Sequence, residues 1–200
     1  MTRMRAVLIV ALCSVFFGCT TGQRQAEVIP LPPVRIAMKG YSFLPPTEEG
    51  WAIAGRSDDQ IALGKQGTHP NESYLILTAL VSKKGVSTRE SLLEVVSKDM
   101  SIAPNGARYR NAHHDVSATI VGGALCAVYD GESEDHGAPA RSGRKDPMIL
   151  HVRQLVCVHP KMKDTLVSVG FSHRHYTENR DATFLVRAQS VFDSLEFSEH

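Results

Sequence analysis

The sequence predicts an α+β domain with one antiparallel sheet of about six to seven strands and two helices packed on one face. Short apolar runs bounded by turn residues recur along the chain, as expected for strands. Two other segments have apolar residues at helical spacing. Their order is strands, a helix, more strands and a last helix, which is typical of α+β proteins.

The first half supplies a hairpin, a strand and a helix. Residues 51–65 (WAIAGRSDDQIALGK) contain two apolar runs on either side of a polar turn cluster, which indicates a hairpin. The continuous apolar run YLILTALV at 74–81 predicts a strand. A helix is expected over 87–100, with Ser87 as its N-cap and Glu90 reaching back to it.

The second half supplies the remaining strands and the last helix. Residues 108–130 are strand-like, with a turn or bulge expected at Gly122-Gly123. Residues 148–158 and 165–175 predict two more strands, and the second alternates apolar and small or polar residues. Residues 181–195 carry a clear amphipathic stripe and predict a helix.

The N-terminus resembles a bacterial lipoprotein signal. Basic residues precede a short apolar run that ends at Gly18-Cys19, and a helix of that length is too short to span a bilayer. We therefore expect residues 1–18 to be a signal peptide, residues 19–40 the lipid anchor and a flexible tether, and residues 41–198 a single domain.

The resemblance implies that the thiol of Cys19 takes a diacylglyceryl group and that the new amine takes an acyl chain such as palmitate. Thr20 follows the cysteine, which in Gram-negative lipoproteins implies the outer membrane and a domain facing the periplasm. Cleavage without lipidation, which would release a free protein, is the alternative.

The charge balance excludes a nucleic-acid-binding protein of the usual basic kind. The chain has 22 basic and 21 acidic side chains, so its formal net charge is +1. Loss of the signal peptide would remove two arginines and leave nothing polybasic beside the anchor. The membrane would then be a partner through the lipid on Cys19 alone.

Two cysteines remain after the signal and the anchor are set aside. Cys126 and Cys157 lie in strand-like stretches, and an even pair in an oxidising compartment predicts a disulfide between them. Two free buried thiols are the alternative. The sequence has no C-x-x-C motif, so it gives no support for a thioredoxin-like redox role.

Residues 131–147 (GESEDHGAPARSGRKDP) predict a long polar loop with an acidic first half and a basic second half. We interpret this loop as a candidate site for a ligand or partner, with a solvated loop of loosely paired charges as the alternative. Its candidate residues are Glu132, Glu134, Asp135, His136, Arg141 and Arg144.

His173 and His175 are weak candidates for a metal site. Residues two apart on a strand share one face, where such a pair can chelate zinc or copper. No third ligand is identifiable, and polar residues at a strand end are the alternative. The sequence also has no nucleophile elbow and no phosphate-binding glycine loop, so we assign no catalytic residue and no cofactor.

Several stretches, among them LPPTEEGWAIAGR, LGKQGTHPNESY and SGRKDPMIL, resemble a group of uncharacterised proteobacterial lipoproteins. The resemblance covers most of residues 41–198, and that group has no assigned activity. The order of the elements is also similar to the PsbP-like fold of extrinsic photosystem subunits, and fold alone does not fix function.

These observations favour a lipid-anchored envelope protein that is a non-enzymatic binding or accessory domain, with an envelope protein as a possible class of partner. The surfaces to test are the part of the sheet that the helices leave uncovered and the loop over 131–147. The alternative is a small envelope hydrolase or metal-dependent enzyme that uses the region of His136, His173 and His175.

Overall fold

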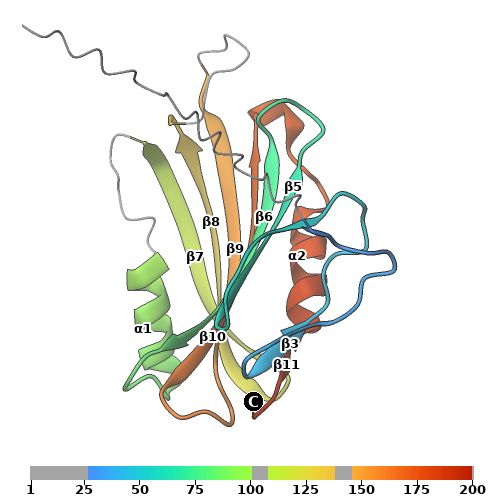
Figure 1. Cartoon of the computed structure of the whole chain (residues 1–200). Helices are drawn as coiled ribbons and strands as arrows, with labels where there is room; N and C mark the ends of the chain where they lie inside the picture. The colour runs from blue at the N-terminus through green and yellow to red at the C-terminus, as the bar shows by residue number, and fades with distance from the viewer. Residues whose placement is uncertain (1–26, 101–107, 138–145, 200) are drawn as a thin grey trace, which may run out of the picture.

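A twisted antiparallel sheet of eight strands runs through the molecule (Figure 1). The computed structural model describes residues 27–100, 108–137 and 146–199. In the order in which they lie side by side, the strands are β1 (Glu27–Val28), β4 (Ala52–Arg56), β5 (Gln60–Gln66), β6 (Ser73–Ser82), β10 (Thr165–His175), β9 (Met148–Val158), β8 (Ala124–Asp135) and β7 (Tyr109–Val121).

A second, three-stranded sheet and two α-helices complete the fold. The remaining elements are β2 (Ile36–Met38), β3 (Tyr41–Phe43), β11 (Glu196–Phe197), α1 (Arg89–Met100), the 3-10 turn η1 (Thr177–Asn179) and α2 (Phe184–Asp193). The antiparallel α+β class is confirmed, but the strands outnumber the six to seven expected. The extra strands are two or three residues long, which is too short for an alternating pattern to be recognised in the sequence.

The ordered domain begins earlier than residue 41. Glu27 and Val28 pair with β4, and Ile36 and Met38 are buried in the core. The stretch 19–40, which we expected to be a flexible tether, therefore contributes two strands from residue 27 onward. These strands lie beside prolines and are two and three residues long, so no alternating pattern reveals them in the sequence.

The two helices pack on opposite faces of the sheet, so the expectation of one covered face is wrong (Figure 1). Strand residues alternate between the faces. Val167 of β10 joins the core beneath α2, whereas its neighbour Leu166 joins a second core beneath α1. The second sheet lies on the α2 side and closes the larger core there.

The N-cap of α1 is Thr88 rather than Ser87. The amide of Ser91 donates to Thr88 Oγ1 over 3.2 Å, and the amide of Thr88 donates to Ser91 Oγ over 3.1 Å. This reciprocal pair has the form of a capping box in which a serine takes the place of the expected Glu90.

The two expected hairpin turns are confirmed. The β4–β5 turn is closed by the amide of Ser57, which donates to the carbonyl of Gln60 over 2.8 Å. Gly122 and Gly123 have φ angles of +55° and +78° and join β7 to β8. Positive φ at both central residues suits a tight two-residue hairpin and favours glycine.

The first five residues of the stretch predicted to be a long polar loop are strand. β8 continues through Asp135, which pairs with Met148 at the start of β9. Strand pairing uses backbone groups, so a polar segment can remain in the sheet when its charged side chains find partners. Residues 138–145, with Arg141 and Arg144, lie outside the described residues.

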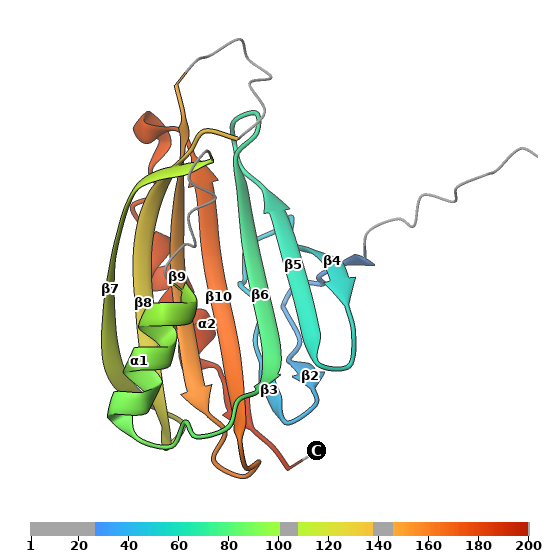
Figure 2. The same cartoon turned by 90° about the vertical axis from the view of Figure 1, so that its left-hand side faces the viewer.

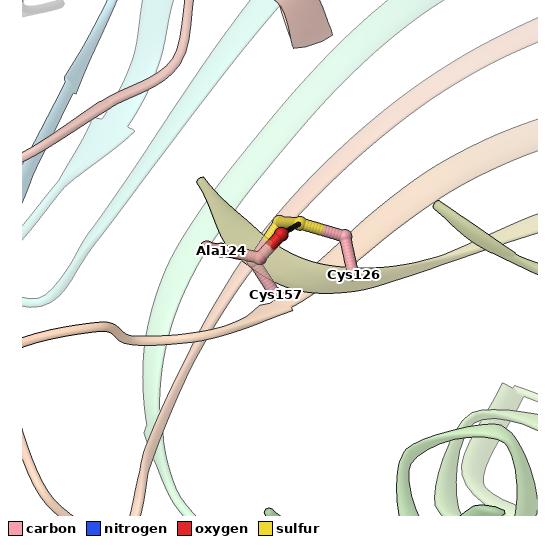
Figure 3. Close-up of a disulfide and its surroundings, with 3 residues drawn as sticks. All are labelled: Ala124, Cys126 and Cys157. Atoms are coloured by element: carbon pink, nitrogen blue, oxygen red, sulfur yellow. Dashed lines mark hydrogen bonds between the residues drawn. A yellow bond between two sulfur atoms is a disulfide. The ribbon is translucent and has the colours of Figure 1, made fainter. Parts of the chain in front are cut away.

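The predicted disulfide between Cys126 and Cys157 is present (Figure 3). The two residues are directly opposite each other on β8 and β9, and both are fully buried on the α2 side. Cys126 Sγ lies 3.4 Å from the carbonyl oxygen of Ala124, a packing contact, because a disulfide sulfur carries no proton to donate. The cross-link fixes the register of these two long strands.

Removing the cross-link is expected to lower the free energy of unfolding by about 3–4 kcal/mol, because it closes a long loop in the unfolded chain. The sequence separation is 31 residues. Urea unfolding of C126A/C157A measures the loss. Reduction of the wild-type protein is the matched control, since it keeps both sulfurs, and equal stability of the oxidised and reduced forms would contradict the expectation.

Candidate functional site

Helix α1 covers only part of its face of the sheet. It packs over β7 and β8 and reaches β9, and Figure 2 shows that it leaves β6 and β5 open. Leu92 and Val96 of the helix pack with Ala127 and Val156 in the core beneath it. The uncovered part of this face contains a groove of about 740 Å³, which we call the open-face groove.

The pairing register explains the shape of the open-face groove. On β10, Gly170 and Ser172 point to this face, and they pair with Leu77 and Leu75 of β6. Ser172 also pairs with Val152 of β9. Side chains of paired residues lie on the same face, so the small residues of β10 form a trough. One flank is the leucines of β6, and the other is Val152 and Gln154 of β9. We call this feature the β10 trough.

The apolar flank of the trough is exposed to solvent. Leu75 is 40% exposed and Leu77 is 39% exposed, and they lie two residues apart on the same face of β6. Adjacent exposed leucines beside a groove are typical of a surface that another molecule covers.

One end of the groove is cationic. Asp135 is fully buried, and Arg108 Nε lies 2.9 Å from its Oδ1 while Arg174 Nε lies 3.0 Å from its Oδ2. Burial alone would raise the pKa of Asp135, but the hydrogen bond from Arg108 and the charge of Arg174 outweigh it and lower that pKa. Two guanidinium groups therefore share one carboxylate, which leaves an excess positive charge.

The lining of the groove contains no acidic residue among the described residues. Lys65 and Arg174 are its cations; Lys65 pairs with Tyr74 on the α2 side, so Arg174 is the cation on the open face. The rest of the lining is mostly apolar or small, including Ala52, Gly64 and Leu150. The open-face groove is thus suited to a ligand with an apolar part and a negatively charged end.

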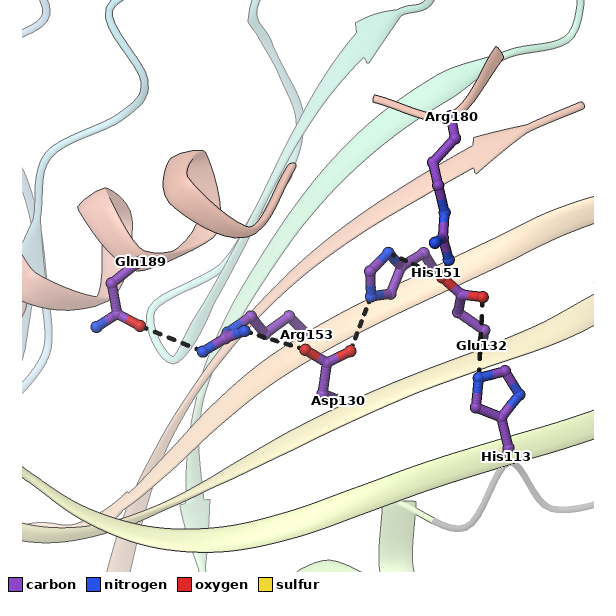
Figure 4. A network of polar contacts seen from close by, with 7 residues as sticks. All are labelled: His113, Asp130, Glu132, His151, Arg153, Arg180 and Gln189. Carbon is purple, nitrogen blue, oxygen red and sulfur yellow. Dashed lines mark hydrogen bonds and ion pairs between the residues drawn. The ribbon is translucent and has the colours of Figure 1, made fainter. Parts of the chain in front are cut away.

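A polar network lies on the other face of the sheet, beside α2 (Figure 4). The Nε2 atom of His151 lies 2.8 Å from Asp130 Oδ1, and its Nδ1 atom lies 3.5 Å from Glu132 Oε1. Arg153 pairs with Asp130 at 3.0 Å, and Arg180 pairs with Glu132. The hydrogen bond from His151 is the main cause that lowers the pKa of Asp130.

This network matches two carboxylates with two guanidinium groups. Its outer members are His113, 3.8 Å from Glu132, and Gln189 of α2, which accepts a hydrogen bond from Arg153 over 3.4 Å. The arrangement ties β8, β9 and α2 together and is balanced in charge. His151 was missed in the sequence because its partners become visible only once the β8–β9 register is known.

The structure divides the residues of the predicted loop site between two faces. Glu132 and Glu134 belong to the α2 side, whereas Asp135 lies on the α1 side between two arginines. His136 Nε2 is 2.9 Å from Glu134 Oε2. These residues therefore do not form one displayed site, and only Asp135 belongs to the cationic end of the groove.

His173 and His175 share one face, as expected, but they are buried rather than at the rim. They are 2% and 1% exposed, and their rings stack at 4.5 Å. The ring of His173 also stacks on Tyr74 at 4.0 Å, and Nδ1 of His175 donates to the carbonyl of Tyr176 over 2.7 Å. Within the described ranges, no group of three or more His, Cys, Asp or Glu side chains is placed to hold a metal ion.

His136 does not join the two buried histidines. Its neighbour Glu134 pairs with Ile149 of β9, which in turn pairs with His175 of β10. Two strand spacings, about 10 Å, therefore separate Glu134 from His175. Among the described residues, His136 contacts Glu134 while His173 and His175 stack on each other, and an enzymatic role for these three histidines stays a prediction.

The expected signal peptide and Cys19 lie outside the described residues. In the part of the chain that the structure describes, no helix has the length and apolar character required to cross a bilayer.

Comparison with known proteins identifies the fold. No family model matches the chain, and no curated protein matches it. The chain is similar to the solution structure of cyanobacterial PsbP (CyanoP) from Synechocystis, with 15% sequence identity and a TM-score of 0.52. The match covers 91% of this chain and 99% of that chain. The chain therefore has a PsbP-like fold, as the order of its elements predicted.

Acidification is expected to destabilise the domain. Burial, with a contribution from His175, lowers the pKa of His173 from 6.5 to about 4. The unfolded chain then binds this proton at a higher pH than the folded chain does, so stability is complete above about pH 6.5 and falls as the pH approaches 4. At about 1.36 kcal/mol per pKa unit, the loss reaches about 3 kcal/mol.

Urea unfolding between pH 7 and pH 4 measures this loss. H173F keeps an aromatic ring against Tyr74 and removes the titrating group, so its stability should vary less with pH. His113 is largely exposed, and H113Q is the matched control that should keep the wild-type dependence. Identical pH dependence in H173F and the wild type would contradict the role of His173.

Proposed function

We propose that this chain is a non-enzymatic binding domain of the bacterial cell envelope, held at the outer membrane by lipid on Cys19. Its binding surface is the open-face groove. The observation that carries the proposal is the pair of exposed leucines, Leu75 and Leu77, beside a groove of about 740 Å³ that α1 leaves uncovered.

The polar clusters of the α2 side support binding rather than catalysis. The carboxylates around His151 are matched by Arg153 and Arg180, and His173 and His175 are buried and stacked. These groups are engaged in holding the fold. The α1 side, in contrast, offers an open surface whose leucines lack a covering element among the described residues.

A lipid on Cys19 would hold the domain close to a membrane. Glu27, the first described residue, lies eight residues after Cys19. Fully extended, that chain spans at most about 28 Å. Strand β1 pairs with β4 through Val28 and Ala52, and Ala52 lines the open-face groove. A lipid on Cys19 would therefore keep the groove close to the bilayer surface.

Lipid attachment is expected to depend on Cys19. Cells that express the full chain should incorporate labelled palmitate into it, and the protein should sediment with the outer membrane. The C19S variant should take up no label and should no longer sediment with the outer membrane, because Cys19 is the residue that carries the lipid. An unlabelled wild-type protein in the soluble fraction would contradict the lipid anchor. It would not contradict the open-face groove as the binding surface.

The groove is expected to contact the binding partner in cells. A benzophenone amino acid in place of Leu77 should form a defined cross-linked adduct on irradiation. The same amino acid in place of Val186 is the matched control, because Val186 is 72% exposed on α2, on the other side of the sheet. No adduct at Leu77, or the same adducts at both positions, would contradict the proposed surface.

A further inference from the structure

The β10 trough is close in length to one lipid acyl chain. Along β10 the groove is lined from Arg174 to Gly170, which is about 13 Å at 3.3 Å per residue. One acyl chain spans half of the roughly 30 Å hydrocarbon core of a bilayer, or about 15 Å. At the far end, Nε2 of Gln154 donates to Ser168 Oγ over 2.6 Å, and this contact lies across the trough.

The width of the trough favours a single alkyl chain over a helix. Its flanks, β6 and β9, are two strand spacings apart, or about 10 Å between backbones. An α-helix with its side chains is about 10–12 Å wide, so it would rest on the flanking leucines without entering. An alkyl chain would lie over Ser172 between Leu75 and Val152. At Gly170 it would lie between Leu77 and Gln154.

The positive charge at the Arg174 end of the trough would favour a ligand with a negatively charged end. Among the described residues, Asp135 is the acidic partner of Arg174, and it is shared with Arg108. A second anion at this end would balance the excess positive charge. In addition, Ser133 is buried on the same face, and its hydroxyl has no hydrogen-bond partner among the described residues.

We propose that the open-face groove binds a single-chain anionic amphiphile of the fatty-acid type, with its carboxylate at Arg174 and its alkyl chain in the β10 trough. The inference rests on the proposed function, because it names the ligand class of the same surface. A bilayer held within reach by Cys19 is a source of such molecules. The domain would then receive or present single acyl chains at the membrane surface.

Calorimetric titration of the mature chain carrying C19S tests the head group and the chain together. We expect dodecanoate to bind with one-to-one stoichiometry below its micellar concentration. Dodecyl maltoside has the same alkyl chain on a neutral head, and we expect it to bind at least tenfold more weakly. Dodecyltrimethylammonium should not bind. Absence of dodecanoate binding, or equal affinity for the three head groups, would overturn the proposal.

G170L tests the position of the chain. A Cβ atom at Gly170 would meet the carbonyl of Leu77 at 3.6 Å and Gln154 at 3.8 Å, which are ordinary contacts, so the variant should fold and fill the trough. It should lose dodecanoate binding while its thermal unfolding stays unchanged. G55L adds the same side chain where nothing lies within 4 Å, and it should bind as the wild type does.

G170L is preferred to a substitution of Arg174, because loss of Arg174 would also disturb the buried Asp135. A folded G170L that still binds dodecanoate would overturn the proposal. A cross-link from Leu77 to a protein, with no dodecanoate binding to the wild type, would overturn the amphiphile and keep the groove as the binding surface. These outcomes therefore distinguish a failure of the amphiphile proposal from a failure of the open-face groove as the binding surface.

Discussion

Strand β10 pairs with ten residues of β6 and ten residues of β9, and this double pairing fixes the face on which each of its side chains lies. Val169 and Phe171 point into the core beneath α2, and Gly170 and Ser172 point to the open face. A shift of one residue would exchange the two sets. One alternating strand therefore supplies both the centre of the core and the floor of the groove.

The two faces meet different physical demands. On the α2 side, aromatic residues and the buried histidines fill a closed space, and the charges around His151 are paired at its edge. On the α1 side, the helix covers only Ala127, Val156 and their neighbours. Beyond it, small residues in β10 leave a hollow that the fold does not fill. This division locates the binding surface and explains why it lies away from the polar clusters.

Local sequence patterns predicted most strands and both helices. The faces that the helices cover and the polar end of β8 depend on contacts between residues that are distant in the sequence. The strands over 148–158 and 165–175 and the Cys126–Cys157 link were visible because alternation and cysteine parity are local signals. The placement of the helices on opposite faces was not visible in the sequence. It depends on consecutive strand residues, such as Leu166 and Val167, that are buried on opposite faces of the sheet. The polar end of β8 resembled a loop because its ion-pair partners come from other strands.

Methyl NMR with a soluble paramagnetic agent tests most directly whether half of the α1-side face is open. The methyl signals of Leu75 and Leu77, which lie on the uncovered half, should be strongly broadened. The signals of Val156, beneath α1 on the same face, should be protected, as should those of Leu155 in the opposite core. Equal protection of Leu77 and Val156 would contradict an open groove, because it would mean that another part of the chain covers it.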